Sequence, residues 1–168
     1  MRHVHISELY RDIYRRFDAL TPVPFDCGRL CNKACCEGDG ETGMYLFPGE
    51  SRLFCNNKNF SVLPTEFTYG GKTAQLLVCK GPCNRNERPL ACRIFPLIPL
   101  YRTGSTLQIV RDPRARFCPL TYPEAAGYID AHFIREVRRT FRLLCKIPQV
   151  AEFLDALSYI LEDYGKLF

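Results

Sequence analysis

The residues best suited to chemistry are cysteines, of which the chain has ten in 168 residues. Eight of them fall into two groups with short gaps: Cys27, Cys31, Cys35 and Cys36, then Cys79, Cys83, Cys92 and Cys118. Short gaps let several sulfurs reach one ion, because a single turn of backbone brings neighbouring thiolates to the same point. The spacing therefore predicts that these eight residues bind metal.

The thiolate ligands alone do not determine which metal binds. Four of them hold Zn²⁺ in a tetrahedral site, and four also hold an iron–sulfur cluster. The eight cysteines suit two four-thiolate sites or one larger cluster with spare thiols. Because Cys35 and Cys36 are adjacent, we expect their side chains to diverge and to serve different metal atoms. The alternative for the whole set is a disulfide framework or free buried thiols.

The start of the chain favours the metal over disulfides. Residues 1–12, MRHVHISELYRD, lack the apolar core of a secretory signal, and we expect a cytoplasmic protein with reduced thiols. No apolar run approaches the roughly 20 residues that span a bilayer, so no membrane partner is expected. A metal ion or cluster is the expected ligand, and a protein partner is left open.

The net charge is +5, from 23 lysines and arginines against 18 acidic residues. Eight ionised thiols and two divalent ions would reduce this to roughly +1, since ligating thiols are deprotonated. The basic residues beside cysteines are then counter-charge for the site. No uninterrupted basic run is present, which makes a nucleic-acid partner unlikely on sequence grounds.

The apolar pattern predicts helices at both ends. Residues 6–20 repeat apolar side chains at three- and four-residue steps, and Pro22 and Pro24 end that helix. Thr121 and Glu124 form a T-x-x-E capping box, which predicts a helical pair over about 121–165, broken at Pro148.

The middle of the chain, about 26–120, is predicted to be the cysteine-rich metal-binding core. Strands are expected at 73–79 and 107–110, with the second free to pair with the first, and loop or extended chain over 80–101. We therefore predict one domain over residues 1–168. Its fold class would be α+β, mostly helix and irregular loop with little sheet, organised around cysteine-bound metal.

These motifs resemble the zinc- or iron-chelating CxxCxxCC (YkgJ-like) family over about residues 26–120. The first cysteine group has three-residue gaps where the family usually has two. The stretch 37–50 is similar to the family's CC-x-G…L-x-P-x-E segment, and 88–96, RPLACRIFP, is similar to its RPxxCRxFP signature. Cys118 matches its last cysteine. A similar cysteine motif occurs in flagellin lysine-N-methylases, which are longer chains.

Arg88 and Arg93 flank Cys92 within that signature. We predict that they bind the cofactor, donating to cluster sulfurs or holding an anionic substrate. The alternative is a structural salt bridge with Glu50 or Glu87. Glu50 itself is a candidate general base or ligand, or only a charge in the first turn of a helix.

Cys55 and Cys145 have no cysteine neighbour, and we expect them to be small buried apolar residues. The predicted function is metal binding through the eight grouped cysteines. Two alternatives remain: a cluster-dependent enzyme, for example one like a protein-lysine methylase, and an interaction module held by structural zinc. The sequence identifies no catalytic residue and leaves open whether the chain is an enzyme.

Overall fold

The computed structural model describes residues 6–36, 40–81, 84–125 and 127–166. Its longer elements are listed here in chain order: α1 Ile6–Asp18, β1 Gly43–Leu46, β2 Phe60–Tyr69, β3 Lys72–Cys79, α2 Leu90–Ile94, β4 Leu97–Leu100, β5 Gln108–Arg111, α3 Ala131–Leu144 and α4 Pro148–Lys166. Helices lie at both ends of this order, and the strands lie in the middle. The α+β class and the terminal helices predicted from the sequence are confirmed.

The strands form two small antiparallel sheets. In the larger one the order is β1-β3-β2, and in the smaller one β4 pairs with β5. A two-residue turn joins β2 to β3, where Gly70 and Gly71 both have positive φ, +50° and +72°. This is the conformation that twists a tight hairpin correctly, and glycine adopts it without a steric penalty. The hairpin places Cys79 at the end of β3, next to the loops that carry the other cysteines.

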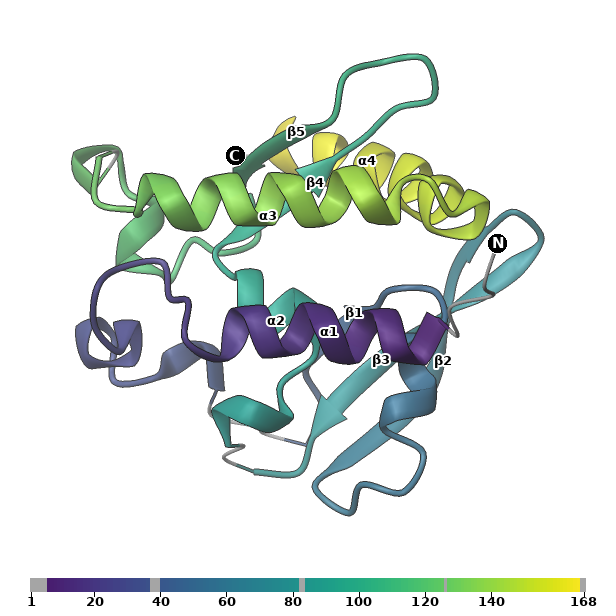
Figure 1. The fold of residues 1–168 in the computed structure, drawn as a ribbon, viewed down its shortest axis with the longest axis horizontal. Helices are drawn as coiled ribbons and strands as arrows, with labels where there is room; N and C mark the ends of the chain where they lie inside the picture. The colour runs from purple at the N-terminus through teal and green to yellow at the C-terminus, as the bar shows by residue number, and fades with distance from the viewer. Residues whose placement is uncertain (1–5, 37–39, 82–83, 126, 167–168) are drawn as a thin grey trace.

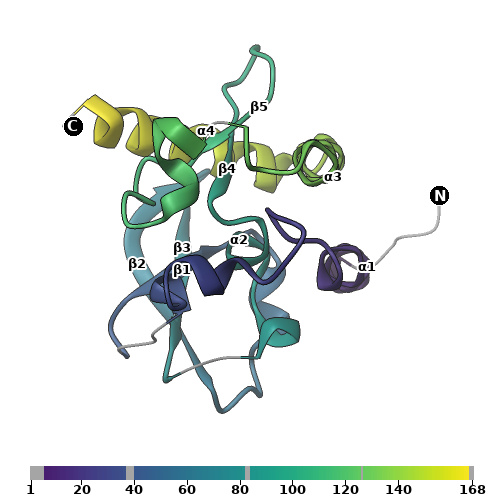
Figure 2. The same ribbon diagram turned by 90° about the vertical axis from the view of Figure 1, so that its left-hand side faces the viewer.

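The helices pack through one apolar core. The first helix buries Tyr10, Ile13 and Phe17, and the Phe17 ring meets the Phe133 ring of α3 edge-on at 6.0 Å. On α4, Phe153 contacts aromatic rings from β2 and from the segment after β1. Figures 1 and 2 show α1 and α3 side by side on one side of the molecule, with α4 behind α3.

The prediction that the fold is organised around metal was wrong. Among the described residues, the main core contains 23 buried side chains, nearly all apolar. They come from all four helices, from β3 and β4 and from the segments between, and Cys118 is the one cysteine among them. Burial of apolar surface on that scale organises a chain of this length without metal. The prediction of little sheet was also wrong, since β2 and β3 have ten and eight residues.

Three expected elements differ in detail. The third helix begins at Ala131 instead of near Thr121, because the Asp130 carboxylate accepts the His132 amide N–H at 2.7 Å and so caps it. The Thr121 hydroxyl donates to the Cys118 carbonyl, so it is not the predicted helix cap.

The segment 80–101, expected to be extended, contains α2 and β4. The strand β5 pairs with β4, and the expected alternative of pairing with the 73–79 strand is not found. No helix among the described residues is both long and apolar enough to cross a membrane.

Candidate metal centre

The first cysteine group lies on two 3₁₀ turns, η1 (Cys27–Leu30) and η2 (Ala34–Cys36). Asp26 starts the first turn, since its side chain accepts the Gly28 amide N–H at 3.1 Å. Between the turns Asn32 and Lys33 have φ of +50° and +61°, so the backbone is left-handed there. This pair reverses the chain and is the local reason that cysteines separated by three other residues can face a common space.

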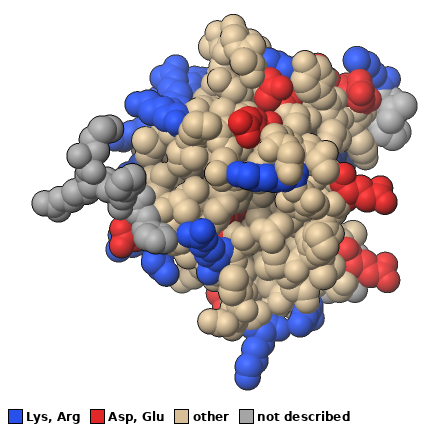
Figure 3. All heavy atoms as spheres, turned by 90° about the vertical axis from the view of Figure 1, so that its right-hand side faces the viewer, with Lys and Arg blue, Asp and Glu red and all other residues tan. Residues whose placement is uncertain are grey.

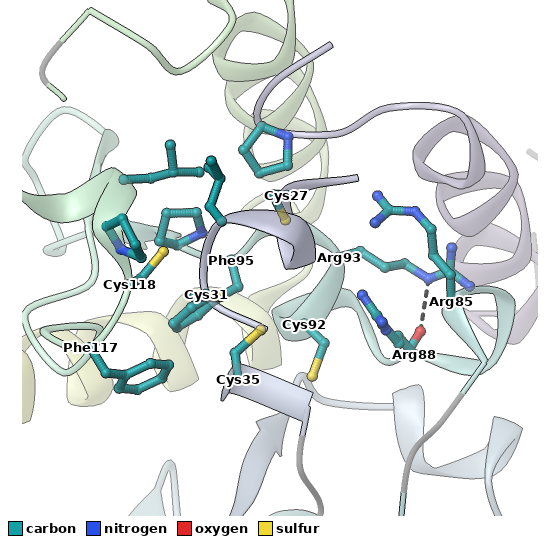
Figure 4. Close-up of a pocket in the computed structure, with 15 residues that line it drawn as sticks. Cys27, Cys31, Cys35, Arg85, Arg88, Cys92, Arg93, Phe95, Phe117 and Cys118 are labelled. Atoms are coloured by element: carbon teal, nitrogen blue, oxygen red, sulfur yellow. Dashed lines mark hydrogen bonds between the residues drawn. The ribbon is translucent and has the colours of Figure 1, made fainter. Parts of the chain in front are cut away.

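The cysteines of both groups meet at two adjoining cavities. One, which we call the inner cavity, is lined by five of them: Cys27, Cys31, Cys35, Cys92 and Cys118. The other, the outer cleft, has a volume of about 300 Å³ and is lined by Cys35, Cys36, Cys79 and Cys92. Because Cys35 and Cys92 line both spaces, the two form one continuous cysteine-lined region. Figure 4 shows Phe117 and Cys118 on one side of the inner cavity and three arginines on the other.

Several thiols of the inner cavity affect one another's pKa. Burial raises the pKa of Cys27, and Cys35 and Cys118 raise it further through charge repulsion, while Arg85 lowers it. Burial likewise raises the pKa of Cys118, the Leu120 amide lowers it, and Cys31 and Cys35 raise it. Four cysteines of the inner cavity therefore interact electrostatically, and ionising them together costs free energy unless a cation is present.

Cys35 and Cys36 do not diverge as predicted. Their sulfurs lie 3.6 Å apart, although the residues are adjacent. Two thiolates on one tetrahedral Zn²⁺ are separated by about 3.8 Å, from a zinc–sulfur distance near 2.3 Å. The expectation that they serve different metal atoms is therefore not supported, and their spacing fits two ligands of a single centre.

The described residues contain no group of three or more cysteine, histidine, aspartate or glutamate side chains placed closely enough to hold a metal ion as they stand. The sulfurs share the cavities but have not converged on one point. Cys83, one of the eight predicted ligands, lies outside the described residues. Among those that are described, every cysteine is free of a disulfide, so the alternative of a disulfide framework finds no support there.

A buried glutamate fixes the helix that carries Cys92. The Glu50 side chain is fully buried, and its carboxylate accepts the amide N–H of Leu90, the first residue of α2, at 2.6 Å. It also accepts the Phe47 amide N–H at 2.9 Å and the Tyr14 hydroxyl. Burial raises the pKa of Glu50, and these hydrogen bonds offset part of that effect. Glu50 thus joins three segments, which is neither the general-base nor the metal-ligand role considered above.

The two segments that carry the family resemblance meet at this point. Glu50 belongs to the L-x-P-x-E stretch, and Leu90 belongs to the RPxxCRxFP stretch. Gly49 has φ of +86°, and an added Cβ would lie 2.6 Å from the Ile6 side chain. The first stretch therefore positions the second, which accounts in physical terms for two motifs that are 38 residues or more apart in the sequence.

Arg93 is a structural residue. Its side chain is buried, and its guanidinium donates to the carbonyls of Arg88 and Asn86, both at 2.7 Å, and pairs with Asp18. It also lies 4.4 Å from the centre of the Tyr14 ring. The predicted salt bridge therefore exists with a different acid, and these bonds leave Arg93 little capacity to bind a cofactor.

Arg88 and Arg85 line the inner cavity with Arg93. Burial and the neighbouring Arg88 charge lower the pKa of Arg85, while Cys27 raises it. The charge of Arg85 thus acts on a cysteine of the site, as expected of the basic residues beside cysteines. Arg85 lies two residues after Cys83 in the sequence, which was the available signal.

The two isolated cysteines lie away from both cavities. Cys145 is half-buried at the end of α3 and packs against the main core, much as expected. Cys55 is exposed, and its thiol donates to the Ser51 carbonyl at 3.4 Å, so the prediction that it is buried was wrong. Both remain useful as controls for the grouped cysteines.

Comparisons with family models, with curated proteins and with solved structures found no match to this chain. The resemblance to the CxxCxxCC family therefore rests on the cysteine and RPxxCRxFP motifs alone. The functional argument rests on the geometry of the cysteine-lined region.

Proposed function

We propose that this chain binds an iron–sulfur cluster or Zn²⁺ through its grouped cysteines, in the manner of the CxxCxxCC family that its motifs resemble. The observation that carries the proposal is that most of the grouped cysteines line the same two cavities. Four segments, around residues 27–36, 79, 92 and 118, bring seven described cysteines to two adjoining cavities. Disulfide bonds or unrelated free thiols would not require such a gathering.

The chemistry of the donors fits such a centre. The cavities offer thiols without a histidine among their lining residues, and soft thiolates are the ligands that zinc and iron–sulfur clusters share. A bound cation supplies the positive charge that the mutually repelling thiolates lack. Cys27, Cys31, Cys35, Cys92 and Cys118 would hold the centre from the inner cavity, and Cys36 and Cys79 from the outer cleft. Cys83 joins this set on its place in the sequence alone.

An accessible centre is a better description than a purely structural zinc site. The core that organises the fold is almost entirely apolar, and Cys35 is exposed at the outer cleft. A structural zinc site is normally closed by four protein ligands, whereas an open cleft lets another molecule approach the metal. This favours a role in which the centre reacts with, or transfers charge to, a second molecule.

Methyl transfer has less support. The described strands pair only in antiparallel fashion, and none is followed by a glycine-rich turn into a helix of the kind that binds dinucleotides and S-adenosylmethionine. A centre with reduced thiolates also agrees with the proposed cytoplasmic location, where thiols stay reduced.

The test is anaerobic expression followed by counting iron, zinc and inorganic sulfide per chain. We expect iron with sulfide, or zinc without sulfide, in the wild type. Cys35→Ser and Cys118→Ser should each lose most of the metal, because both residues line the inner cavity. Cys55→Ser is the matched control and should keep the wild-type content. A wild type without bound metal, or equal losses in the control, would overturn the proposal.

A further inference from the structure

The exposed face of α3 carries a stripe of arginines. Arg135, Arg138, Arg139 and Arg142 include pairs three and four residues apart, so they lie on the same side of the helix. With a rise of 1.5 Å per residue, the stripe spans about 10 Å. These four side chains and Glu136 line a shallow groove along the helix.

Most of this positive charge is not neutralised. Arg139 lies 3.7 Å from Glu136, which is the one acidic side chain in the groove. Within the described part of the chain, Arg135, Arg138 and Arg142 form no ion pair. Some other surface arginines are matched by an acid, as Arg102 is by Glu162. The stripe therefore presents an excess of cations to solvent.

The helix holds these cations on a rigid support. Its opposite side is buried through Phe133, Val137, Phe141 and Leu144, so its rotation about its own axis is fixed. Figures 1 and 2 show α3 at the outer edge of the fold. Arg135, Arg139 and Arg142 are exposed there. By contrast, the face drawn in Figure 3 carries both signs of charge, separated by uncharged side chains.

We infer that this arginine stripe binds the phosphate backbone of a nucleic acid. Each strand of DNA carries one phosphate per about 3.4 Å of helix axis, so a stripe of about 10 Å faces about three phosphates. Guanidinium groups bind phosphate oxygens in a two-pronged geometry, and Arg is preferred to Lys for that purpose.

Two other kinds of partner, a protein and an anionic bilayer, fit the surface less well. A protein interface needs a buried apolar centre, and the groove contains none; Leu143, at its end, is the one large apolar residue of α3 that is exposed. An anionic bilayer would require apolar side chains to enter it, and those of α3 are already packed in the core. Binding to a phosphate backbone requires only the cationic side chains.

The inference is independent of the proposed metal. The arginine stripe shares no residue with the inner cavity or the outer cleft, so binding of the backbone and loss of the metal can be measured separately. It also reverses the expectation from the sequence, where Glu136, Val137, Thr140 and Phe141 interrupt the basic residues. The arginines come together only when the segment is helical.

The test measures binding of the purified full chain to a short fluorescent DNA duplex, and to an RNA duplex of the same sequence, across a salt series. The double variant Arg135→Gln/Arg142→Gln is compared with Arg11→Gln/Arg52→Gln, which removes the same charge from exposed positions on α1 and the segment after β1. We expect log K to fall linearly with log salt, and the slope for DNA to be about 1.8 smaller in the stripe variant. The control variant should keep the wild-type slope, and both duplexes should bind.

Three outcomes would overturn the inference. The first is absence of salt-dependent binding to either duplex by the wild type. The second is an equal loss in the control variant, which would indicate attraction by net charge alone. The third is preference for polyglutamate or for vesicles containing anionic lipid over the duplexes, measured by competition. Circular dichroism of each variant shows that the fold is retained, so a loss of binding reports on the stripe.

Discussion

The helical core and the cysteine-lined region of this molecule are stabilised in different ways. In the core, apolar side chains such as Phe141 and Phe153 are fully buried and contact other rings. In the cysteine-lined region the backbone forms short 3₁₀ turns, and most thiols are only partly buried. The comparison teaches that the stability of the fold and the position of the thiols have separate physical origins.

Glu50 connects the two regions. Its carboxylate accepts a hydrogen bond from Tyr14 in the core helix α1 and another from Leu90 at the start of α2, which carries Cys92. Because the buried Glu50 carboxylate is bonded to both α1 and α2, a substitution of Glu50 should lower both the stability of the fold and the metal content. Changes elsewhere should affect one property and leave the other.

The largest effect is expected from Phe153→Ala. This side chain is fully buried, and its ring lies 5.1 Å from Tyr69 and 5.7 Å from Phe47, so it joins α4 to the three-stranded sheet. Removing a buried aromatic ring costs about 3–5 kcal/mol through lost burial and the cavity that remains. Urea unfolding followed by circular dichroism measures this cost.

The matched control is Ile160→Ala on the exposed side of the same helix, which should change stability by no more than about 0.5 kcal/mol. Folded Phe153→Ala protein should bind as much metal per chain as the wild type. A large loss of metal in the folded variant would show that the two regions are not separable in this way.

The next largest effect is expected from Glu50→Gln, which keeps the shape of the side chain. Both carboxylate oxygens accept hydrogen bonds, so the amide NH₂ of glutamine must face a buried donor. Leaving buried donors unsatisfied costs about 1–3 kcal/mol, and more where a charged group is involved. We expect lower stability in urea and a lower metal content, because the start of α2 moves with Cys92.

Glu87→Gln serves as the comparison, since Glu87 is half-buried and its partners are two asparagine side chains, Asn57 and Asn59. It should leave both properties near wild type. Equal metal content in Glu50→Gln and the wild type would mean that α2 is held mainly by other contacts.

The terminal helices and β3 were predictable because apolar side chains recur along them at the spacing of a helix or a strand. The strand β2 and the helix α2 were not predicted, since they depend on contacts between distant segments that this spacing does not encode. The strand β2 contains Pro64, which argues against a central strand but is tolerated here because β2 is an edge strand. The pair Gly70-Gly71 before β3 was the available hairpin signal.

The cysteines of the site were predictable from their spacing, but their surroundings were not. Glu50 and Leu90 lie 40 residues apart, and their hydrogen bond follows from how α1, the segment after β1 and α2 pack together. Arg93 was expected to serve a cofactor because it follows Cys92. The packing of α2 against α1 instead brings it beside Asp18 and the Tyr14 ring.

A smaller effect on the fold is expected from metal removal. If the core is independent of the thiols, treatment with a chelator under reducing conditions should leave the helical circular dichroism nearly unchanged. Hydrogen exchange should rise in residues 27–36, because a metal that ties several segments together would no longer hold the 3₁₀ turns. Ions that do not bind thiolates, such as added Mg²⁺, should not restore the protection. Loss of the helical signal together with the metal would make the metal a structural element of the whole fold.

The smallest effect is expected at Cys145, an isolated cysteine that packs against the main core. Burial raises the pKa of Cys145 from 9.0 to about 11. The folded state therefore holds this proton more tightly than the unfolded state, and the stabilising contribution is complete below pH 9.0 and disappears as the pH rises to about 11. Since the thiolate is the nucleophile, alkylation of Cys145 should rise tenfold per pH unit from about 7.5 to 9.5 without levelling.

Mass spectrometry of the peptide that contains Cys145 measures the alkylation rate. The same peptide in urea should level near pH 9, where an unshifted thiol is half ionised. A plateau near pH 9 in the folded protein would show that Cys145 is solvated, and that the end of α3 is looser than the rest of the core. Burial thus raises the pKa of Cys145 alone, whereas at Cys27 and Cys118 neighbouring cysteines add to the effect of burial.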